Sequence, residues 1–403
     1  MKAVFLSLIC ALTILSCTDT RLHKIESLWY YTTADSPDSD QYQLLNEFQN
    51  LEKLINEQSG YIYIKTEFDI DPSIMNGNPA ISLGRIITAD ETYINGHFIG
   101  KTGSFPPRFF SSWNETRSYM VPRSLLKQTG NELIIKVFIN GEGELIGSRY
   151  IGDSTAIRTK TFIDDFFNSY INALIFVIMI IFGFYHFLIY LKRKQDVENL
   201  YYALLALSFA IYETNFFIQV LPDPLSVVPS YLFFQKIIFI SQYFVAYFLA
   251  YFIKTFSKHK SYKLTDILLL VALLAPVIPH LFFFDYGAFR NFTRLVQPLI
   301  LLPIIYIIFV LLYSIKKKKK EPLYLLIGVT PLLVFVLLDV FLHQVLKMAD
   351  LVYLSGVGFP AFMIAVLFIM ANKFVNYHNE FERMNIKLEK KNDELKLLYN
   401  ASL

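Results

Sequence analysis

The chain has 403 residues, of which 54% are hydrophobic and only 18% are charged. Globular domains carry about 25% charged residues, so this composition argues against a soluble protein and predicts a membrane protein. The formal net charge of +3 is small, and we expect no nucleic-acid partner.

The first 17 residues have the pattern of an export signal. A positively charged start at Met1 and Lys2 precedes an apolar stretch over 3–15, which is too short to span a membrane. Leu15-Ser16-Cys17 resembles the end of a bacterial lipobox, so we expect residues 1–17 to be a signal peptide and Cys17 to be lipidated. The alternative is an ordinary signal peptide with a chance cysteine. The other cysteine, Cys10, lies in the same segment, so the rest of the chain has no disulfide.

Residues 18–165 are polar and are expected to form an exported all-β domain. Alternating apolar and polar residues predict at least five strands, over 61–68, 80–84, 91–94, 118–121 and 132–139. Asn95-Gly96 predicts a tight hairpin, and Gly130-Asn131 predicts a turn before the last of these strands. One helix is predicted over 41–57, where an apolar stripe is formed by Leu44, Leu45, Phe48, Leu51, Leu54 and Ile55.

Part of this domain resembles the galactose-binding-like jelly roll. The likeness runs in order through 81–84, 89–96, 99–103, 117–122 and 130–137. It implies a jelly-roll fold whose relatives in many cases bind sugars and in others act as spacers. The candidate residues for stacking on a sugar are Tyr93, His97, Phe110 and Trp113, and the alternative is that they belong to the core or its rim. Asp90 and Arg117 are positioned to pair across strands, whereas no carboxylate pair suggests glycosidase chemistry.

Seven apolar runs follow, and together they predict a transmembrane bundle over 170–372. The runs cover 170–191, 199–221, 231–253, 264–284, 295–315, 323–345 and 351–371. Each run is long enough for a helix that crosses about 30 Å of hydrocarbon. The first, third and fifth loops hold 12 Lys and Arg residues, against three in the alternate loops, namely Arg290, Arg294 and Lys347. We therefore expect the basic loops and the C-terminus to be cytoplasmic and the N-terminal domain to be extracytoplasmic.

Ionisable residues within the apolar runs are candidates for a functional site. Glu213 lies in the second run, and Asp339 and His343 are four residues apart in the sixth, on one helix face. One interpretation is a proton relay or ion site. The other is a hydrogen-bonded pair that fixes helix packing.

Residues 373–403 predict a cytoplasmic coiled coil. Phe374, Phe381, Leu388 and Leu395 recur every seven residues, and Lys391 is the one flaw in the companion series. This pattern predicts a homodimer through 374–398. No nucleotide-binding, metal or catalytic motif follows before Leu403, so we expect signalling to require a partner output protein.

The whole layout resembles the bacterial seven-transmembrane receptors with diverse intracellular signalling modules. The resemblance implies an inner-membrane receptor, in contact with membrane lipid, that detects an extracytoplasmic small molecule or carbohydrate. We expect no enzymatic activity, cofactor or metal site. The alternatives are a membrane-anchored carbohydrate-binding or adhesion protein without signalling and, less favoured, a transporter.

Overall fold

The computed structural model describes residues 21–34, 36, 41–55, 57, 59–75, 77–219, 231–260, 262–317, 321–339, 341–342 and 354–401. The signal peptide over 1–17, Cys17 and His343 lie outside these residues. The chain divides into two compact units, one comprising 1–249 and 263–303 and the other 250–262 and 304–403. Each unit is described by itself.

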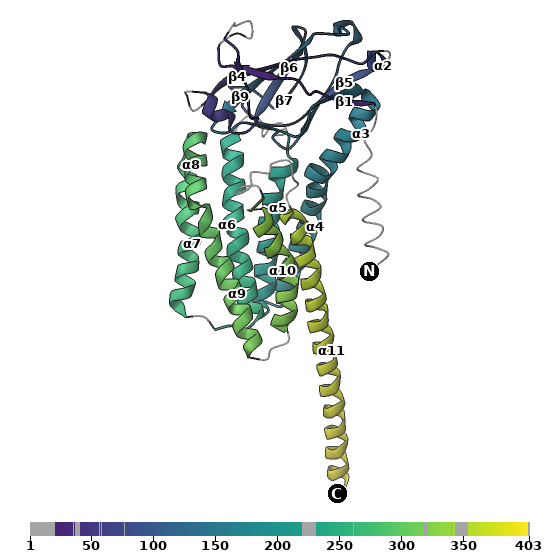
Figure 1. Ribbon diagram of the computed structural model, residues 1–403. Helices are drawn as coiled ribbons and strands as arrows, with labels where there is room; N and C mark the ends of the chain where they lie inside the picture. The colour runs from purple at the N-terminus through teal and green to yellow at the C-terminus, as the bar shows by residue number, and fades with distance from the viewer. Residues whose placement is uncertain are drawn as a thin grey trace. The chain divides into compact units, whose positions relative to one another are not determined.

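The first unit begins with a β-domain made of two antiparallel sheets (Figure 1). The six-stranded sheet has the order β3 (Gln43–Leu44), β2 (Trp29–Thr32), β4 (Ser59–Phe68), β9 (Asn131–Asn140), β6 (Ala89–Ile94) and β7 (His97–Thr102). The five-stranded sheet contains β1 (Leu22–Lys24), β11 (Tyr150–Asp153), β5 (Pro79–Ile87), β10 (Glu144–Ile146) and β8 (Thr116–Met120). All five predicted strands are confirmed, as β4, β5, β6, β8 and β9.

Alternation along the strands separates a buried face from an outer face. On β4, Ile62 and Ile64 are fully buried, whereas Lys65 and Glu67 lie on the outer side. The buried side chains of both sheets form one apolar core, so the domain is a jelly-roll-like sandwich. The predicted hairpin is also confirmed, because Asn95 and Gly96 join β6 to β7 with φ angles of 50° and 81°.

The helix predicted over 41–57 is wrong. This stretch contains β3 and one short 3₁₀ turn at Leu51–Leu54. Its backbone bonds to distant partners instead, since Leu45 N donates to the Trp29 carbonyl and Leu51 N to the Gly143 carbonyl. The apolar residues that suggested a helical stripe reach the core from irregular chain and from the 3₁₀ turn, apart from the exposed Leu44.

The β-domain also contains two short helical segments, Pro72–Met75 and Arg123–Leu125, and from Ser154 onward the regular elements of the described residues are helices. In the first unit α3 (Ser154–Asp165) leads through a π-helical turn, η3 (Phe166–Tyr170), into α4 (Ile171–Lys192), and α5 (Val197–Phe217) packs against α4. The other helices are α6 (Tyr231–Phe256), α7 (Lys263–Leu281), α8 (Tyr286–Val296), η5 (Gln297–Ile300), α9 (Leu301–Lys316), α10 (Glu321–Asp339) and α11 (Ser355–Ala401).

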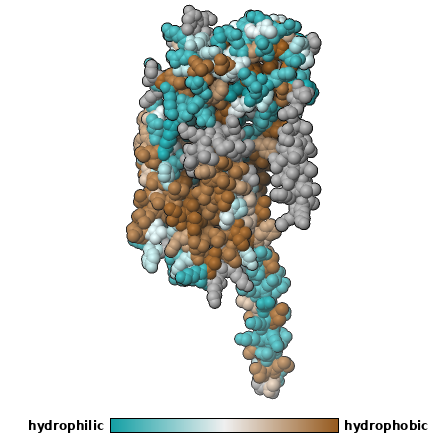
Figure 2. Space-filling model, viewed as in Figure 1, coloured by the Kyte–Doolittle hydropathy of each residue, from teal (hydrophilic) through white to brown (hydrophobic). Residues whose placement is uncertain are grey.

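Within the described residues, each predicted apolar run lies mostly in helix. Among the described residues, five continuous helical stretches are long and apolar enough to cross a membrane: Ser154–Lys192, Tyr231–Phe256, Lys263–Leu281, Tyr286–Lys316 and Gly358–Ala401. Leu323–Asp339 is shorter, and α5 carries two glutamates among its 21 residues. On the face shown in Figure 2, the helix bundle presents a mainly hydrophobic surface, whereas the β-domain and the C-terminal part of α11 are mainly hydrophilic.

In the second unit, α10 packs closely against α11. A Cβ added to Gly328 would lie 2.5 Å from the Ala365 Cβ, so the missing side chain permits the approach. Helix α11 continues for 47 residues without interruption, and every residue from 374 to 401 is exposed.

Candidate functional site

A loop of the β-domain contacts the ends of the membrane helices within the first unit. We call residues 109–115, between β7 and β8, the docking loop. Arg117, at the start of β8, holds this loop by donating to the carbonyls of Ser112 and Glu115 at 2.6 and 2.7 Å. The Arg117 Nε also donates to the Asp90 carboxylate at 2.8 Å, and both side chains are fully buried. The predicted Asp90–Arg117 pair is therefore confirmed, and it positions the docking loop.

The docking loop donates three side-chain hydrogen bonds to the C-terminal end of α5. Trp113 Nε1 reaches the Asn215 carbonyl at 3.1 Å, Asn114 Nδ2 reaches the Phe216 carbonyl at 2.9 Å, and Ser112 Oγ reaches the Gln219 carbonyl at 2.6 Å. The last carbonyls of any α-helix have no partner inside the helix. The docking loop supplies partners for two of these carbonyls, Asn215 and Phe216, and binds Gln219 two residues beyond the helix, so it caps α5.

Asn114 connects two membrane helices to the β-domain. Its Nδ2 also donates to the Asn168 carbonyl in η3, the π-helical turn that precedes α4. Its Oδ1 accepts a hydrogen bond of 2.9 Å from Arg85 on β5, and the side chain is buried. Both ends of the amide are thus fixed, which orients it toward α4 and α5.

Aromatic packing extends this contact to α6 and α8. The Phe110 ring lies 5.5 Å from Tyr231 and 5.7 Å from Phe234, measured between centroids, and Phe109 lies 5.2 Å from Tyr231. Tyr231 in turn lies 5.2 Å from Tyr286 of α8. These rings form one buried apolar cluster.

A second contact joins the β9–β10 loop to α8. The Glu142 carboxylate accepts a hydrogen bond of 2.6 Å from the Tyr286 hydroxyl and forms an ion pair of 2.8 Å with Arg290. Gly141 has a φ of +71°, and a Cβ added there would lie 3.4 Å from the Gly287 Cα. Glu142 therefore adds a contact with α8 to those of the docking loop, while β11 leads directly into α3, whose Asp165 accepts a hydrogen bond of 3.0 Å from the Thr116 backbone N–H of β8.

Burial governs the electrostatics at the base of the docking loop. It raises the pKa of the Asp90 carboxyl, while the Arg117 guanidinium acts in the opposite direction. Burial also raises the pKa of Tyr119, whose hydroxyl donates to Asp90 at 2.8 Å. The pKa of Glu115 is raised as well, and burial is the largest cause. The Arg117 guanidinium opposes this shift. The Asp90–Arg117 network is buried and held by several hydrogen bonds, which suits a structural joint.

The structure does not bring the four proposed sugar-stacking residues together. Phe110 and Trp113 belong to the docking loop and face the membrane helices. Tyr93 and His97 lie on the β6–β7 hairpin, where Tyr93 pairs with Phe98 and His97 pairs with Ile94. Since side chains alternate between faces along a strand, Tyr93 and His97 point to opposite sides.

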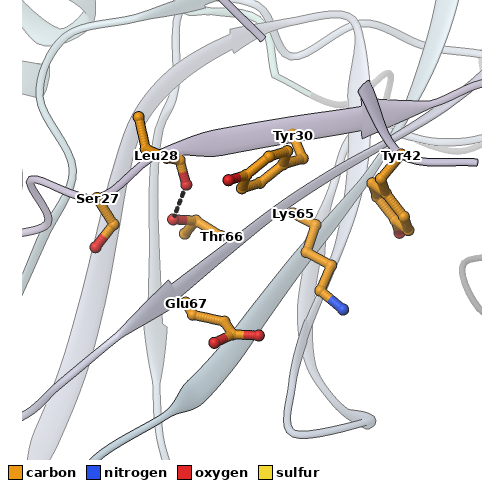
Figure 3. A pocket seen from close by; sticks show the side chains of 7 residues that line it. All are labelled: Ser27, Leu28, Tyr30, Tyr42, Lys65, Thr66 and Glu67. Carbon is orange, nitrogen blue, oxygen red and sulfur yellow. Dashed lines mark hydrogen bonds between the residues drawn. The ribbon is translucent and has the colours of Figure 1, made fainter. Parts of the chain in front are cut away.

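The outer face of the six-stranded sheet contains an open hollow of about 410 Å³, shown in Figure 3. Its lining residues are Ser27, Leu28, Tyr30, Tyr42, Lys65, Thr66 and Glu67. They come from the start of β2, from the chain before β3 and from β4. None of them was among the residues singled out from the sequence.

Two of the three intramembrane candidates lie in the described part of the chain. Glu213 on α5 is fully buried, and neither carboxylate oxygen has a hydrogen-bond partner among the described residues. Asp339 ends α10, where its Oδ1 accepts a hydrogen bond of 2.8 Å from the Leu354 backbone N–H. That hydrogen bond lies at the C-terminal end of α10. The proposed pairing of Asp339 with His343 stays a prediction, because His343 lies outside the described residues.

Sequence reasoning missed the contact residues Ser112, Asn114, Glu142 and Arg290. Arg290 entered only as one of the loop charges. The available signal was the polar run Ser111-Ser112-Trp113-Asn114, which offers several hydrogen-bond donors in a loop that also contains Phe109 and Phe110.

A sequence model described as 7TM diverse intracellular signalling matches residues 168–373, which is half of the chain. No curated protein matches the chain.

Solved structures match the β-domain region only distantly. A β-glucuronidase from Ruminococcus gnavus has 10% identity and a TM-score of 0.27, over 34% of this chain and 29% of that enzyme. A glycosyl hydrolase family 2 member from Bacteroides cellulosilyticus has 11% identity and a TM-score of 0.27, over 33% of this chain and 20% of that protein. The chain spans less than a third of the length of these proteins.

Proposed function

The chain belongs to the seven-transmembrane family with diverse intracellular signalling, and from this premise we propose that it is a membrane sensor for an extracytoplasmic ligand. The observation that carries the proposal is the docking loop. Its side chains cap α5 and reach η3 before α4, so a change in the β-domain acts directly on helix ends. A β-domain that was only tethered to a membrane anchor would need no such joint.

We propose a bacterial inner-membrane location with the β-domain outside and the C-terminus in the cytoplasm. The support is the bias of Lys and Arg toward alternate loops. An exported β-domain then faces the ligand, for which we propose a small molecule of carbohydrate type. Lipidation of Cys17 would add a second attachment to the membrane.

The output in this proposal passes through α11. Helix α11 runs from the membrane segment into the exposed stretch after 374 without a break. Its heptad residues suit a parallel homodimer, which a cytoplasmic output protein then recognises. Helix rotation or sliding carries the signal, so the chain itself needs no catalytic site.

The alternative is an adhesion or carbohydrate-binding protein that uses its helices only as an anchor. The two functions differ in whether a change at the docking loop reaches the tail. In the receptor, weakening the joint shifts the equilibrium between arrangements of the helices. In a protein whose helices serve only as an anchor, weakening the docking loop leaves the arrangement of the tails unchanged.

The test uses the full chain with its native cysteines replaced and a reporter cysteine at 381. Asn114→Ala removes the hydrogen bonds to the carbonyls of Phe216 and Asn168. We expect it to change the yield of crosslinking between tails in membranes by about twofold or more, corresponding to several tenths of a kcal/mol.

Asn78→Ala is the matched control, because the exposed Asn78 side chain accepts a hydrogen bond from Arg123 inside the β-domain and, among the described residues, makes none to the helices. It should leave the crosslinking yield unchanged. Equal yields for wild type, Asn114→Ala and Asn78→Ala would favour the anchor and reject the receptor.

A further inference from the structure

We propose that the hollow on the outer face of β2 and β4 is the ligand site, and that it takes a neutral sugar unit (Figure 3). This inference rests on the proposed receptor function and names its ligand site. At about 410 Å³ the hollow is in the lower part of the range for small-molecule sites. It lies on residues that differ from the four suggested by the sequence.

Strand register builds the hollow. Tyr30 of β2 and Lys65 of β4 are direct cross-strand partners, and Glu67 lies two residues further along β4 on the same face. The Thr66 hydroxyl donates to the Leu28 carbonyl at 2.8 Å, which fixes the chain at the entry to β2. Tyr30, Lys65, Thr66 and Glu67 are therefore held by the sheet, while Ser27, Leu28 and Tyr42 come from the chain just before β2 and β3.

Three polar groups around the hollow are left without side-chain partners. Within the described residues, the Ser27 hydroxyl, the Tyr30 hydroxyl and the Glu67 carboxylate make no hydrogen bond or ion pair. Together they offer hydroxyl donors and a charged acceptor to one bound molecule. Tyr30 is 37% exposed, so its ring also offers an apolar surface to that molecule.

The charges select the class of ligand. Lys65 is engaged by Glu132 in an ion pair and lies 5.4 Å from the centroid of the Tyr42 ring. Glu67 lies opposite Glu132 in the register of β4 and β9, so the unpaired charge beside the hollow is negative. Phosphates and other anions are disfavoured there.

The same chemistry argues against two further ligand classes. A lipid chain would need an enclosed apolar cavity, whereas this hollow is open and carries hydroxyl and charged groups. A free amino acid would need a cation available for its carboxylate, and Lys65 is already paired. A polyhydroxylated ring donates to Glu67, accepts from Ser27 and Tyr30, and places its C–H face on an aromatic ring.

The experiment titrates the full chain in lipid nanodiscs by calorimetry with lactose, cellobiose, maltose and diacetylchitobiose. We expect saturable binding of at least one of these sugars. Glu67→Gln and Tyr30→Ala should each lower its affinity about tenfold, as expected for loss of a hydrogen bond to a charged group or of a stacked ring. Glu67 is exposed, so the thermal stability of Glu67→Gln should change little. Tyr30→Ala removes a ring that is only 37% exposed, so its melting temperature is measured alongside its affinity.

Glu26→Gln is the matched control, because Glu26 is an exposed glutamate next to the hollow that pairs with Lys24. It should bind sugar like the wild type. The inference is overturned if none of the four sugars binds, if Glu67→Gln and Glu26→Gln bind equally, or if Tyr93→Ala abolishes binding while Glu67→Gln does not. Saturable binding of glycine or glutamate in place of the sugars also overturns it.

The two proposals fail separately. If no sugar binds but Asn114→Ala still changes the crosslinking between tails, this ligand site is rejected and the proposed receptor function stands. Sugar binding without any effect of Asn114→Ala keeps the site and rejects signalling through the docking loop.

Discussion

The Asp90–Arg117 pair links the stability of the β-domain to the shape of the docking loop. Arg117→Met leaves the Asp90 carboxylate buried without its partner and frees the carbonyls of Ser112 and Glu115. Breaking a buried pair from one side costs about 3–5 kcal/mol, so we expect a loss of that size in the free energy of unfolding. Fluorescence during denaturant unfolding measures it directly, because both tryptophans, Trp29 and Trp113, lie in the β-domain.

Arg123→Met provides the control for this variant. Arg123 makes one exposed hydrogen bond of 3.2 Å to Asn78, so its loss should cost less than about 1 kcal/mol. Adding Asp90→Asn to Arg117→Met removes the unpaired charge and should restore part of the lost stability. Similar losses for Arg117→Met and Arg123→Met would contradict a structural role for the buried pair.

At the scale of single residues, sequence reasoning succeeded where both partners lie in the part of the β-domain that resembles a known fold. Asp90 and Arg117 were predicted to pair because they lie in the segments 89–96 and 117–122, which resemble the galactose-binding-like jelly roll. Trp113 was open to several interpretations, since a loop aromatic looks the same whether it meets a sugar or a helix. Its actual partner, the Asn215 carbonyl, is 102 residues away along the chain.

At the scale of elements, periodicity predicted the long strands and the apolar helices. It failed over 41–57, because apolar residues spaced by three and four also occur in an irregular chain that covers the edge of a core. There the backbone bonds to Trp29 and Gly143 decide the structure, and neither bond is visible from local spacing. The strands β1, β10 and β11 were missed because three or four residues carry too little pattern.

The fifth apolar run shows a second limit at this scale. The run was expected to be one helix over 295–315, whereas the helical stretch begins at Tyr286 and includes the short 3₁₀ segment Gln297–Ile300. Asp285 caps its start by accepting from the Ala288 N–H at 2.7 Å. Hydropathy alone could not find this beginning, because α8 carries Arg290 and Arg294, and Arg290 pairs with Glu142.

At the scale of the whole molecule, the proposed orientation follows from the bias of Lys and Arg between loops and from the export signal at the N-terminus. A periplasm-specific reporter fused after Phe284, between α7 and α8, should be active. The same reporter fused after Lys194, between α4 and α5, should be inactive because that basic loop is expected to remain cytoplasmic. A cytoplasm-specific reporter at the same two sites should give the opposite pattern. Activity in the reverse order would reject the proposed orientation.

Dimerisation through the tail is the remaining prediction for the whole molecule. Residues 374–398 form about four heptads, near the lower limit for a stable isolated coiled coil. Their heptad residues are strongly exposed in the single chain, with Phe374 at 70%, Phe381 at 57% and Leu388 at 66%. Confinement to a membrane raises the effective concentration of the tails, so a weak helix–helix interface along 374–398 is sufficient for a dimer.

Cysteine substitution tests this seam, again in a chain with its native cysteines replaced. Cysteines at 381 or 388 should crosslink readily between chains, since both positions face the partner in a parallel coiled coil. Cysteines at 382 or 389, one step around the helix, should crosslink several times less, and Glu382 and Glu389 are the matched native positions. Lys391 weakens the layer that follows Leu388, so yields should fall toward the C-terminal end. Uniform crosslinking across 374–398 would mean that the tail forms no parallel seam. The receptor would then lack the route proposed here from the docking loop to its output partner.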